Sequence, residues 1–439
     1  MASPGCSARL KTVQRTSLTL AFLIGMVSYM DRTTLSVANP LIRKDLGLSI
    51  ADMGLLLSAF LWPYAFALLA AGGVVDRFLP RRVLAAALLL WSAAQVLAGF
   101  VSSFGEFVVA RVLLGIGEAP TFPCFARVVR GWYRARDQAL SVGIWNASPS
   151  FGIAVSAPVL TVIMLALGWR WMFVVMGIVG VVLAVVWFLV FRDVSEVALA
   201  DDEKSHLLDG EEAMEPRQVN FAEWRRLFGF RATWGLILGF FGNVYIGWLF
   251  ISWLPGYLEM QRHMSIPKTG LVASVPFLCG VVGSIAGGWF ADKLMSKGFS
   301  AINSRKIPTI ISLVVMAAGT LVAAETPSNF IAVGAISVAV FFGFASSGTS
   351  WALATACAPT HCAASLGAIM DFGGFIGGAL APMVTGFVVQ ATGSFVPALL
   401  TASMIGLLSA VAYLVAIPGR PIHKSELRGV AASPPMALG

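Results

Sequence analysis

Five charged residues lie deep inside otherwise apolar stretches of this 439-residue chain: Asp31, Arg32, Arg111, Glu118 and Asp371. A charged side chain left in hydrocarbon costs roughly 2.5 kcal/mol or more, so such groups usually face a protein-lined cavity and take part in function. A guanidinium can grip a carboxylate through two parallel hydrogen bonds, and a buried acid can exchange protons near neutral pH. The set therefore suits coupled movement of an anion and protons.

The spacing of these residues separates their tasks. Arg111 and Glu118 are seven apart, so on a helix they share one face about 10 Å from each other. Asp31 and Arg32 are neighbours and point in different directions around a helix, so we expect them to address different partners. We predict that Arg32 binds a substrate carboxylate, that Asp31 and Glu118 take up protons, and that Arg111 tunes Glu118. The alternative is a set of fixed ion pairs that only orient helices.

The composition indicates which elements position these charges. The chain is 58% hydrophobic and only 12% charged, with a mean hydropathy of +0.83, whereas soluble domains are about 25% charged. We therefore predict an all-α membrane protein with twelve transmembrane helices. The spans are expected at 17–38, 53–74, 83–101, 105–126, 139–166, 171–191, 233–256, 270–291, 307–324, 329–354, 364–388 and 395–417.

The spans divide into two groups of six around a polar segment. We expect an N-terminal half at 1–191, a linker at 192–232, a C-terminal half at 233–417 and a tail at 418–439. The linker contains DDEKSH and DGEEAMEPRQ, and its charge prevents it from crossing a membrane.

Lysine and arginine set the expected orientation. With a cytoplasmic N-terminus, 23 of the 30 basic residues fall on the cytoplasmic side and five on the other, as the positive-inside rule requires. We therefore place both termini, the linker and the tail in the cytoplasm. The net charge of +8 then reflects topology, and we expect a lipid bilayer rather than nucleic acid as the surrounding partner.

An internal repeat links the two groups of spans. GGVVDR leaves the second span at Gly72 to Arg77, and GGWFADK leaves the eighth at Gly287 to Lys293. Glycines let helices approach closely, and an acid beside a basic loop can form a charge cluster that breaks when the halves move. We predict a gating role for Asp76, Arg77, Asp292 and Lys293.

Four stretches narrow this pattern to a known family. They are YMDRTTLSVA, RVLLGIGEAPTFP, WLPGYLEMQRHMS and DFGGFIGGALAP. With twelve spans and paired loops, the chain resembles the major facilitator superfamily over nearly its whole length, and within it the anion:cation symporter family. That family includes bacterial sugar-acid permeases, sialin and the vesicular glutamate transporters. The resemblance implies parallel halves with a substrate site between them near mid-membrane.

The resemblance also implies roles for single residues. Asp31 and Glu118 match the coupling acids of the family, and Arg32 matches a residue that contacts substrate. Tyr29, Tyr64 and Trp351 match aromatic residues that contact the ligand.

One further polar residue is expected in the pocket, and three positions depart from the family pattern. Asn146 is a polar side chain in the fifth span that can hydrogen-bond a substrate hydroxyl. The chain departs from the family at Asp371, where asparagine is common, at Pro149, where a galactonate-binding relative has glutamine, and at Leu79, where glycine is expected. Asp371 keeps an acceptor for substrate hydroxyls but adds a titratable charge.

Together these features predict a proton-coupled symporter that imports an organic anion, most simply a hexonate, hexuronate or aldarate. An aromatic-acid or other carboxylate transporter working by exchange or sodium coupling is the nearer alternative, and a transporter-like membrane sensor is a different class. The sequence holds no HExxH motif, nucleophile elbow, paired-cysteine metal site or GxxxxGK[ST] loop, so we expect neither an enzyme nor an ATP-driven pump. We expect no cofactor, no metal, a monomeric state and a bacterial inner-membrane location.

Overall fold

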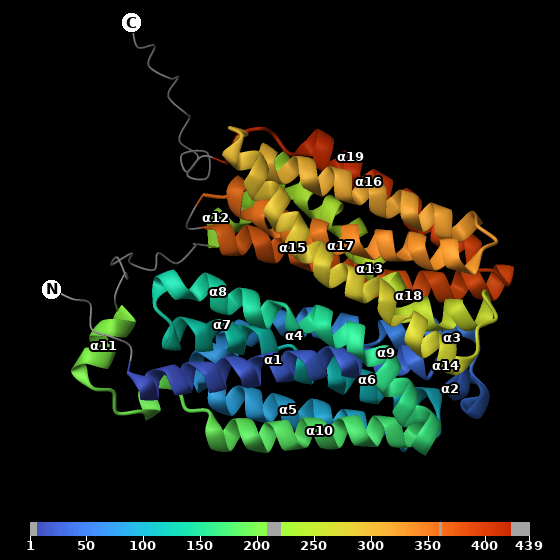
Figure 1. Ribbon diagram of the computed structural model, residues 1–439, viewed down its shortest axis with the longest axis horizontal. Coiled ribbons are helices and arrows are strands. Elements are labelled where there is room, and N and C mark those ends of the chain that lie inside the picture. The colour runs from blue at the N-terminus through green and yellow to red at the C-terminus, as the bar shows by residue number, and fades with distance from the viewer. Residues whose placement is uncertain (1–6, 209–220, 360–361, 423–439) are drawn as a thin grey trace, which may run out of the picture. The chain divides into compact units, whose positions relative to one another are not determined.

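The computed structural model describes residues 7–208, 221–359 and 362–422, and within these ranges the chain is helical without a strand (Figure 1). The first ten helices are α1 (Ala8–Val37), α2 (Asn39–Leu46), α3 (Ile50–Ser58), α4 (Leu61–Phe78), α5 (Pro80–Ala98), α6 (Phe104–Glu118), α7 (Thr121–Trp132), α8 (Ala135–Asn146), α9 (Ser148–Leu167) and α10 (Trp169–Val190). The remainder are α11 (Asp201–Leu208), α12 (Phe221–Leu227), α13 (Arg231–Met260), α14 (Ile266–Val272), α15 (Ser274–Ser296), α16 (Asn303–Glu325), α17 (Asn329–Cys357), α18 (Ala363–Thr392) and α19 (Val396–Ala416).

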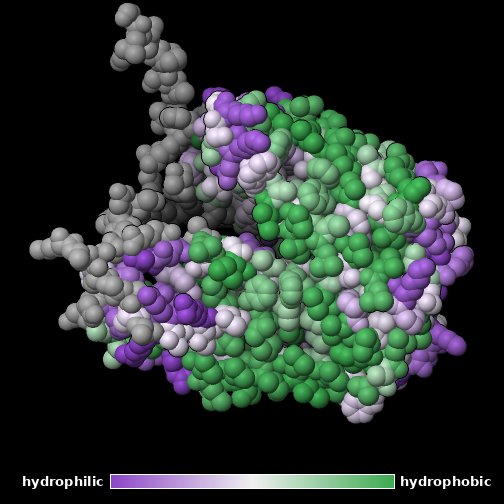
Figure 2. All heavy atoms as spheres, in the orientation of Figure 1, coloured by the Kyte–Doolittle hydropathy of each residue, from purple (hydrophilic) through white to green (hydrophobic). Residues whose placement is uncertain are grey.

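Eleven stretches of the described residues are helical, long and apolar enough to cross a membrane. The predicted first span, α1, is 30 residues long but is not among them, because Asp31, Arg32 and its basic first turns lower its hydropathy. Large apolar side chains such as Leu189, Ile285 and Leu408 are exposed on the outer faces of their helices. Apolar atoms cover most of the face shown in Figure 2, and hydrophilic residues gather at the helix ends. The predicted all-α membrane fold is confirmed.

Four of the predicted spans are broken into two helices. The breaks separate α3 from α4, α6 from α7, α8 from α9 and α14 from α15. A proline lies in or just after each break, because proline lacks an N–H and clashes with the carbonyl four residues earlier; these prolines are Pro63, Pro120, Pro149 and Pro276. Two residues of the site described below, Phe60 and Glu118, therefore lie at helix ends rather than within regular helix.

The chain forms two compact units whose limits differ from the predicted halves. Unit 1 comprises residues 1–214, 249–278 and 379–395, and unit 2 comprises residues 215–248, 279–378 and 396–439. In unit 1, α1 packs against α9 and α5 against α10. In unit 2, α16 packs against α17 and α19. The predicted domain limits, including the linker, stay a prediction.

Unit 1 joins the N-terminal helices to the ends of α13 and α18 through a set of contacts that we call the seal. Ser36 on α1 donates its hydroxyl to the carbonyl of Ser252 on α13 at 2.6 Å. Ser58 on α3 donates to the carbonyl of Ala379 on α18, also at 2.6 Å. Trp253 then ties α13 to α18, since its indole N–H donates to the carbonyl of Pro382 at 3.0 Å. In all three contacts of the seal, a side chain of one helix donates to a backbone carbonyl of another, and two of these side chains are short serines.

Two glycines make the closest of these approaches. A Cβ added to Gly54 on α3 would lie 2.8 Å from the carbonyl oxygen of Pro382 and 3.0 Å from the Cα of Gly386, both on α18. These are backbone atoms, so α3 and α18 cannot keep their separation if either glycine gains a side chain.

We expect Gly54→Ala to lower the apparent melting temperature of the purified protein in detergent, at a cost of about 1–3 kcal/mol, because the new methyl group overpacks the seal. Gly72→Ala is the matched control. Gly72 lies within α4 with no atom near its added Cβ, so its replacement should be neutral or stabilise the helix by about 0.5–1 kcal/mol. Intrinsic tryptophan fluorescence during heating measures both, and equal melting temperatures for the two variants would contradict this account of the seal.

Candidate functional site

Arg32 and Glu118 form a buried ion pair inside unit 1. The Nε of Arg32 on α1 donates to Oε2 of Glu118 at the end of α6 at 2.7 Å, and both side chains are almost fully excluded from solvent. The hydroxyl of Ser28 donates to the same oxygen at 2.7 Å. Ser28 lies one helical turn before Arg32, so α1 presents both donors on one face. One oxygen of Glu118 thereby accepts hydrogen bonds from two donors of the same helix.

Three aromatic rings enclose the guanidinium of Arg32. Its Cζ lies 4.2 Å from the centroid of Tyr29, 4.8 Å from that of Phe60 and 4.8 Å from that of Tyr64. The rings of Phe60 and Tyr64 stack on each other at 5.5 Å. Aromatic faces attract a cation and shield it from water, so the cage keeps Arg32 charged and fixes its plane.

Several polar atoms of this cluster have no hydrogen-bond partner among the residues that the structure describes. They are Nη1 and Nη2 of Arg32, both carboxyl oxygens of Asp31, Oε1 of Glu118, and Nε and Nη1 of Arg111. All four side chains are buried, and Asp31 lies within electrostatic range of the other three. Burying polar groups without partners is costly, so the cluster is arranged for something other than stability. Its unpartnered guanidinium fork has the geometry to receive a carboxylate.

Sequence reasoning missed three residues that support this cluster. Ser28 carries a signal in its i, i+4 spacing to Arg32, but a serine in a membrane helix is common enough to escape notice. Gln95 on α5 is buried and donates to the hydroxyl of Thr34 at 3.0 Å, and Thr34 donates to the carbonyl of Asp31 at 2.7 Å. Phe60 carries no such signal, because only tertiary packing brings it to Arg32.

The remaining predicted binding residues lie on α8 of unit 1 or in unit 2. Asn146 is exposed at the end of α8 in unit 1. In unit 2, Trp351 on α17 is 43% exposed, and its ring meets α18 at Gly367. Asp371 on α18 is half-buried. Their part in substrate binding stays a prediction.

The predicted gating residues lie at helix ends. Arg77 is exposed in the last turn of α4, where its guanidinium contacts the ring of Phe78. Lys293 in unit 2 is exposed and lies 4.6 Å from the ring of Trp289, and Asp292 is also exposed. The side chain of Asp76 lies outside the described part of the chain. A gating role for these four residues is still only predicted.

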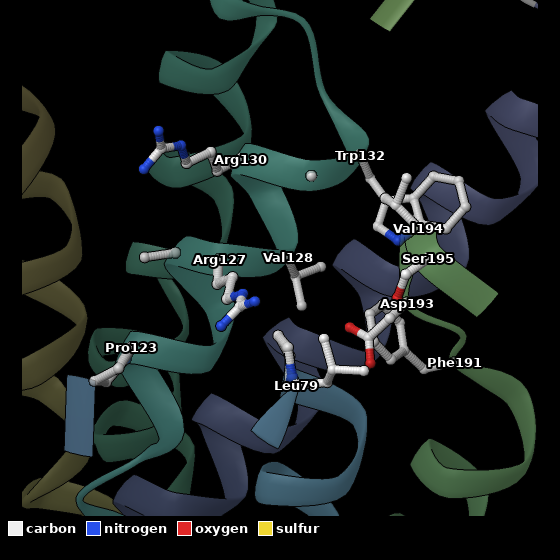
Figure 3. A pocket seen from close by; sticks show the side chains of 13 residues that line it. Leu79, Pro123, Arg127, Val128, Arg130, Trp132, Phe191, Asp193, Val194 and Ser195 are labelled. Atoms are coloured by element: carbon white, nitrogen blue, oxygen red, sulfur yellow. The ribbon is translucent and has the colours of Figure 1, made fainter. Parts of the chain in front are cut away.

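A hollow of about 790 Å³ opens at the end of unit 1 where α7 ends, and it contains none of the predicted site residues (Figure 3). Its labelled side chains come from α7, from Leu79 before α5, and from the segment after α10. Asp193 is buried there and accepts a hydrogen bond from the backbone N–H of Arg81 at 3.2 Å. Burial raises the pKa of Asp193 above its ordinary value. We therefore take the charged cluster around Arg32, and not this hollow, as the candidate site.

A caged charge cluster with unpartnered atoms among the described residues, set between long apolar helices, is typical of a transporter. Residues 21–382 match the Major Facilitator Superfamily, and the chain belongs to that family. The family match confirms the expected major facilitator fold and the expectation that the protein transports solutes instead of transforming them.

Curated relatives align over nearly the whole chain. The chain is 38% identical over 408 residues to a probable L-galactonate transporter of Escherichia coli K12, covering 93% of this chain and 90% of that protein. It is 30% identical to a D-galactonate transporter of E. coli O6:H1 (strain CFT073), with 91% and 95% covered. It is 31% identical to a probable galactarate/D-glucarate transporter of Bacillus subtilis 168, with 95% and 94% covered.

Solved structures share the fold at lower identity. A bacterial homolog of the human lysosomal transporter Spinster, inward-facing and unoccupied, superposes with a TM-score of 0.73 at 20% identity, covering 92% of this chain and 95% of that one. A D-xylose-proton symporter superposes with a TM-score of 0.71 at 16% identity, with 92% and 99% covered.

At pH 8 we expect Arg32→Gln to destabilise the protein by about 3–5 kcal/mol, because the buried Glu118 carboxylate loses its cation. The loss should be smaller at pH 5, where protonation removes the unpaired charge of Glu118. The double variant Arg32→Gln/Glu118→Gln should recover most of the lost stability at pH 8. Thermal unfolding in detergent at both pH values measures these changes. A double variant no more stable than Arg32→Gln would show that the ion pair is not the interaction that matters.

Proposed function

We propose that this protein is a proton-coupled symporter that imports a sugar acid, namely a hexonate, hexuronate or aldarate, by alternating access. It works as a single chain in a bacterial inner membrane with both termini in the cytoplasm. The proposal rests on the charged cluster around Arg32 and on the sugar-acid transporters to which the chain is similar.

The guanidinium of Arg32 is the observation that carries the proposal. Glu118 takes only Nε, while Nη1 and Nη2 have no partner within the described residues. These two nitrogens form the end-on fork that binds both oxygens of a carboxylate. The rings of Tyr29, Phe60 and Tyr64 hold the guanidinium in place. Binding of a substrate carboxylate therefore loses little conformational entropy of the Arg32 side chain.

Protons and cargo are coupled through the same cluster. With Asp31 and Glu118 ionised, two acids balance Arg32 and Arg111, and an added anion meets no net attraction. Protonation of both acids leaves two positive charges, weakens the hold of Glu118 on Arg32 and favours binding of an anion. Loss of the protons to the cytoplasm reverses these changes and releases the substrate. Ser28 and Gln95 support the acids by fixing Glu118 and the α1 backbone.

The sugar-acid class follows from the relatives and from the polar character of the proposed pocket. Three aligned relatives are named for galactonate, or for galactarate and glucarate. Such ligands carry one or two carboxylates and several hydroxyls. We assign the carboxylate to Arg32, and contacts to the polyol chain to Tyr29, Tyr64, Asn146, Trp351 and Asp371.

The expected orientation determines the side of the membrane on which the seal lies. If both termini are cytoplasmic, the C-terminal end of α1 and the ends of α13 and α18 lie at the extracytoplasmic face. The seal is then the extracytoplasmic gate in its closed state. Asp76, Arg77, Asp292 and Lys293 belong to the opposite, cytoplasmic face, where we propose that they act in the second gate.

We expect Glu118→Gln to abolish uptake of labelled L-galactonate into proteoliposomes under an imposed pH gradient, while counterflow between equal pH values is retained. Glutamine keeps the shape of the site but cannot release a proton, so exchange survives and coupling fails. Glu106→Gln is the matched control, because Glu106 lies on the same helix, is exposed and bonds only Ser102 and Ser103. Retained gradient-driven uptake in Glu118→Gln would rule out this acid as a coupling site.

We expect Arg32→Lys to weaken substrate binding about 10- to 100-fold, because an ammonium replaces a fork that donates two charged hydrogen bonds. Thermal shift or calorimetric titration with L-galactonate, D-galactonate, galactarate, D-glucarate and benzoate measures the affinity. The same panel tests the substrate class. Tight binding of benzoate with no response to the four sugar acids would overturn that class.

A further inference from the structure

Another acid, Glu259, lies beside the seal at the end of α13 and plays no part in the Arg32 cluster. It follows Pro255 by one turn near the end of α13 and lines a narrow crevice in unit 1. Val37 of α1, Thr161 of α9 and Thr269 of α14 line the same crevice. The crevice holds no water-sized void, so the part of Glu259 that lies inside it can be satisfied only by the protein.

No protein group satisfies Glu259 in the described part of the chain. Its carboxyl group is half-buried and forms neither a hydrogen bond nor an ion pair there. None of the other residues that line the crevice, from α1, α9, α13 or α14, is charged or titratable. The nearest basic residues along the chain have other contacts or face solvent: Arg262 donates to the hydroxyl of Tyr257 at 2.7 Å, and Lys268 is exposed.

A second polar group in the crevice is also left without a partner. The hydroxyl oxygen of Thr269 is fully buried and makes no hydrogen bond among the described residues. Close packing fixes its position, because a Cβ added to the next residue, Gly270, would lie 2.7 Å from the Cβ of Thr161. A carboxylic acid and a hydroxyl can each donate and accept a hydrogen bond, whereas a carboxylate can only accept.

We propose that Glu259 is a separate proton-binding site that controls the seal: the seal closes when Glu259 is protonated and opens when it is ionised. Closing the crevice over a carboxylate would strip some of its water without supplying a cation, and no hydroxyl of the crevice donates to Glu259 among the described residues, which is costly. Closing it over the neutral acid avoids most of that cost. The inference rests on the proposed function, because it adds a proton to the same transport cycle at a place where no substrate binds.

The proposal gives the extracytoplasmic gate its own response to pH. At an acidic outer face, Glu259 takes up a proton after the substrate site has loaded, and closure becomes favourable. At an alkaline outer face, the ionised carboxylate keeps the gate hydrated and open. One proton changes the ratio of open to closed protein by at most about tenfold for each pH unit.

The test measures opening of the seal without any substrate. Spin labels are placed at Lys44→Cys on α2 and Lys268→Cys on α14, both exposed at the sealed end, in a chain whose native cysteines are replaced by alanine. Double electron–electron resonance in liposomes between pH 5 and pH 9 then reports the distance across the seal. We expect the long-distance population to grow with pH in this background, by at most the factor above. Glu259→Gln should stay closed at every pH.

Two further variants make the result decisive. Glu106→Gln removes an exposed acid outside the crevice and should keep the pH response. Thr269→Val should move the pH midpoint while the response persists. An unchanged response in Glu259→Gln, no response in the background chain, or a response to sodium in place of pH would each overturn the proposal. Because the readout needs no substrate, it decides the role of Glu259 whether or not the wild-type protein accumulates a sugar acid.

Discussion

The proposed site depends on the buried guanidinium of Arg32, which gives one nitrogen to Glu118 and whose other two nitrogens have no hydrogen-bond partner among the described residues. Membrane helices offer no water to satisfy such a group, so every neighbour must contribute. Ser28 shares the Glu118 oxygen, and three aromatic rings enclose the charge. The arrangement is costly while it is incomplete. Because the unpartnered groups raise the free energy of the empty site, binding of an anion or of protons can lower it.

The seal differs from the cluster, because the polar groups that join its helices have hydrogen-bond partners. Hydroxyls of Ser36 and Ser58 reach backbone carbonyls, and Gly54 lets α3 meet α18 without a side chain between them. Small residues and short hydrogen bonds make a contact that is tight when closed and exposes little apolar surface when open. Glu259, beside the seal, is the exception: its carboxyl has no partner among the described residues, and it is the group through which we propose that closure depends on pH.

The cluster and the seal share α1, which connects the two parts of the proposed cycle. Asp31 and Arg32 lie at the site, and Ser36 lies one turn further along at the seal. Gln95 fixes the same turn of α1 through Thr34. A shift of α1 that accompanies binding at Arg32 would therefore move Ser36 directly and change its hydrogen bond to Ser252.

The sequence by itself determined the class of protein, the approximate spans and the identity of the buried charges, because apolar length and rare ionisable residues are local properties that the bilayer constrains strongly. Only the tertiary structure decided that Glu118 holds the Nε of Arg32, that Phe60 closes the cage, and that the ends of α13 and α18 belong to the same compact unit as α1. Helical periodicity tells which residues share a face of one helix. Which face meets which neighbour depends on the packing of distant segments. Only this packing shows that Glu259 is surrounded by uncharged residues of other helices.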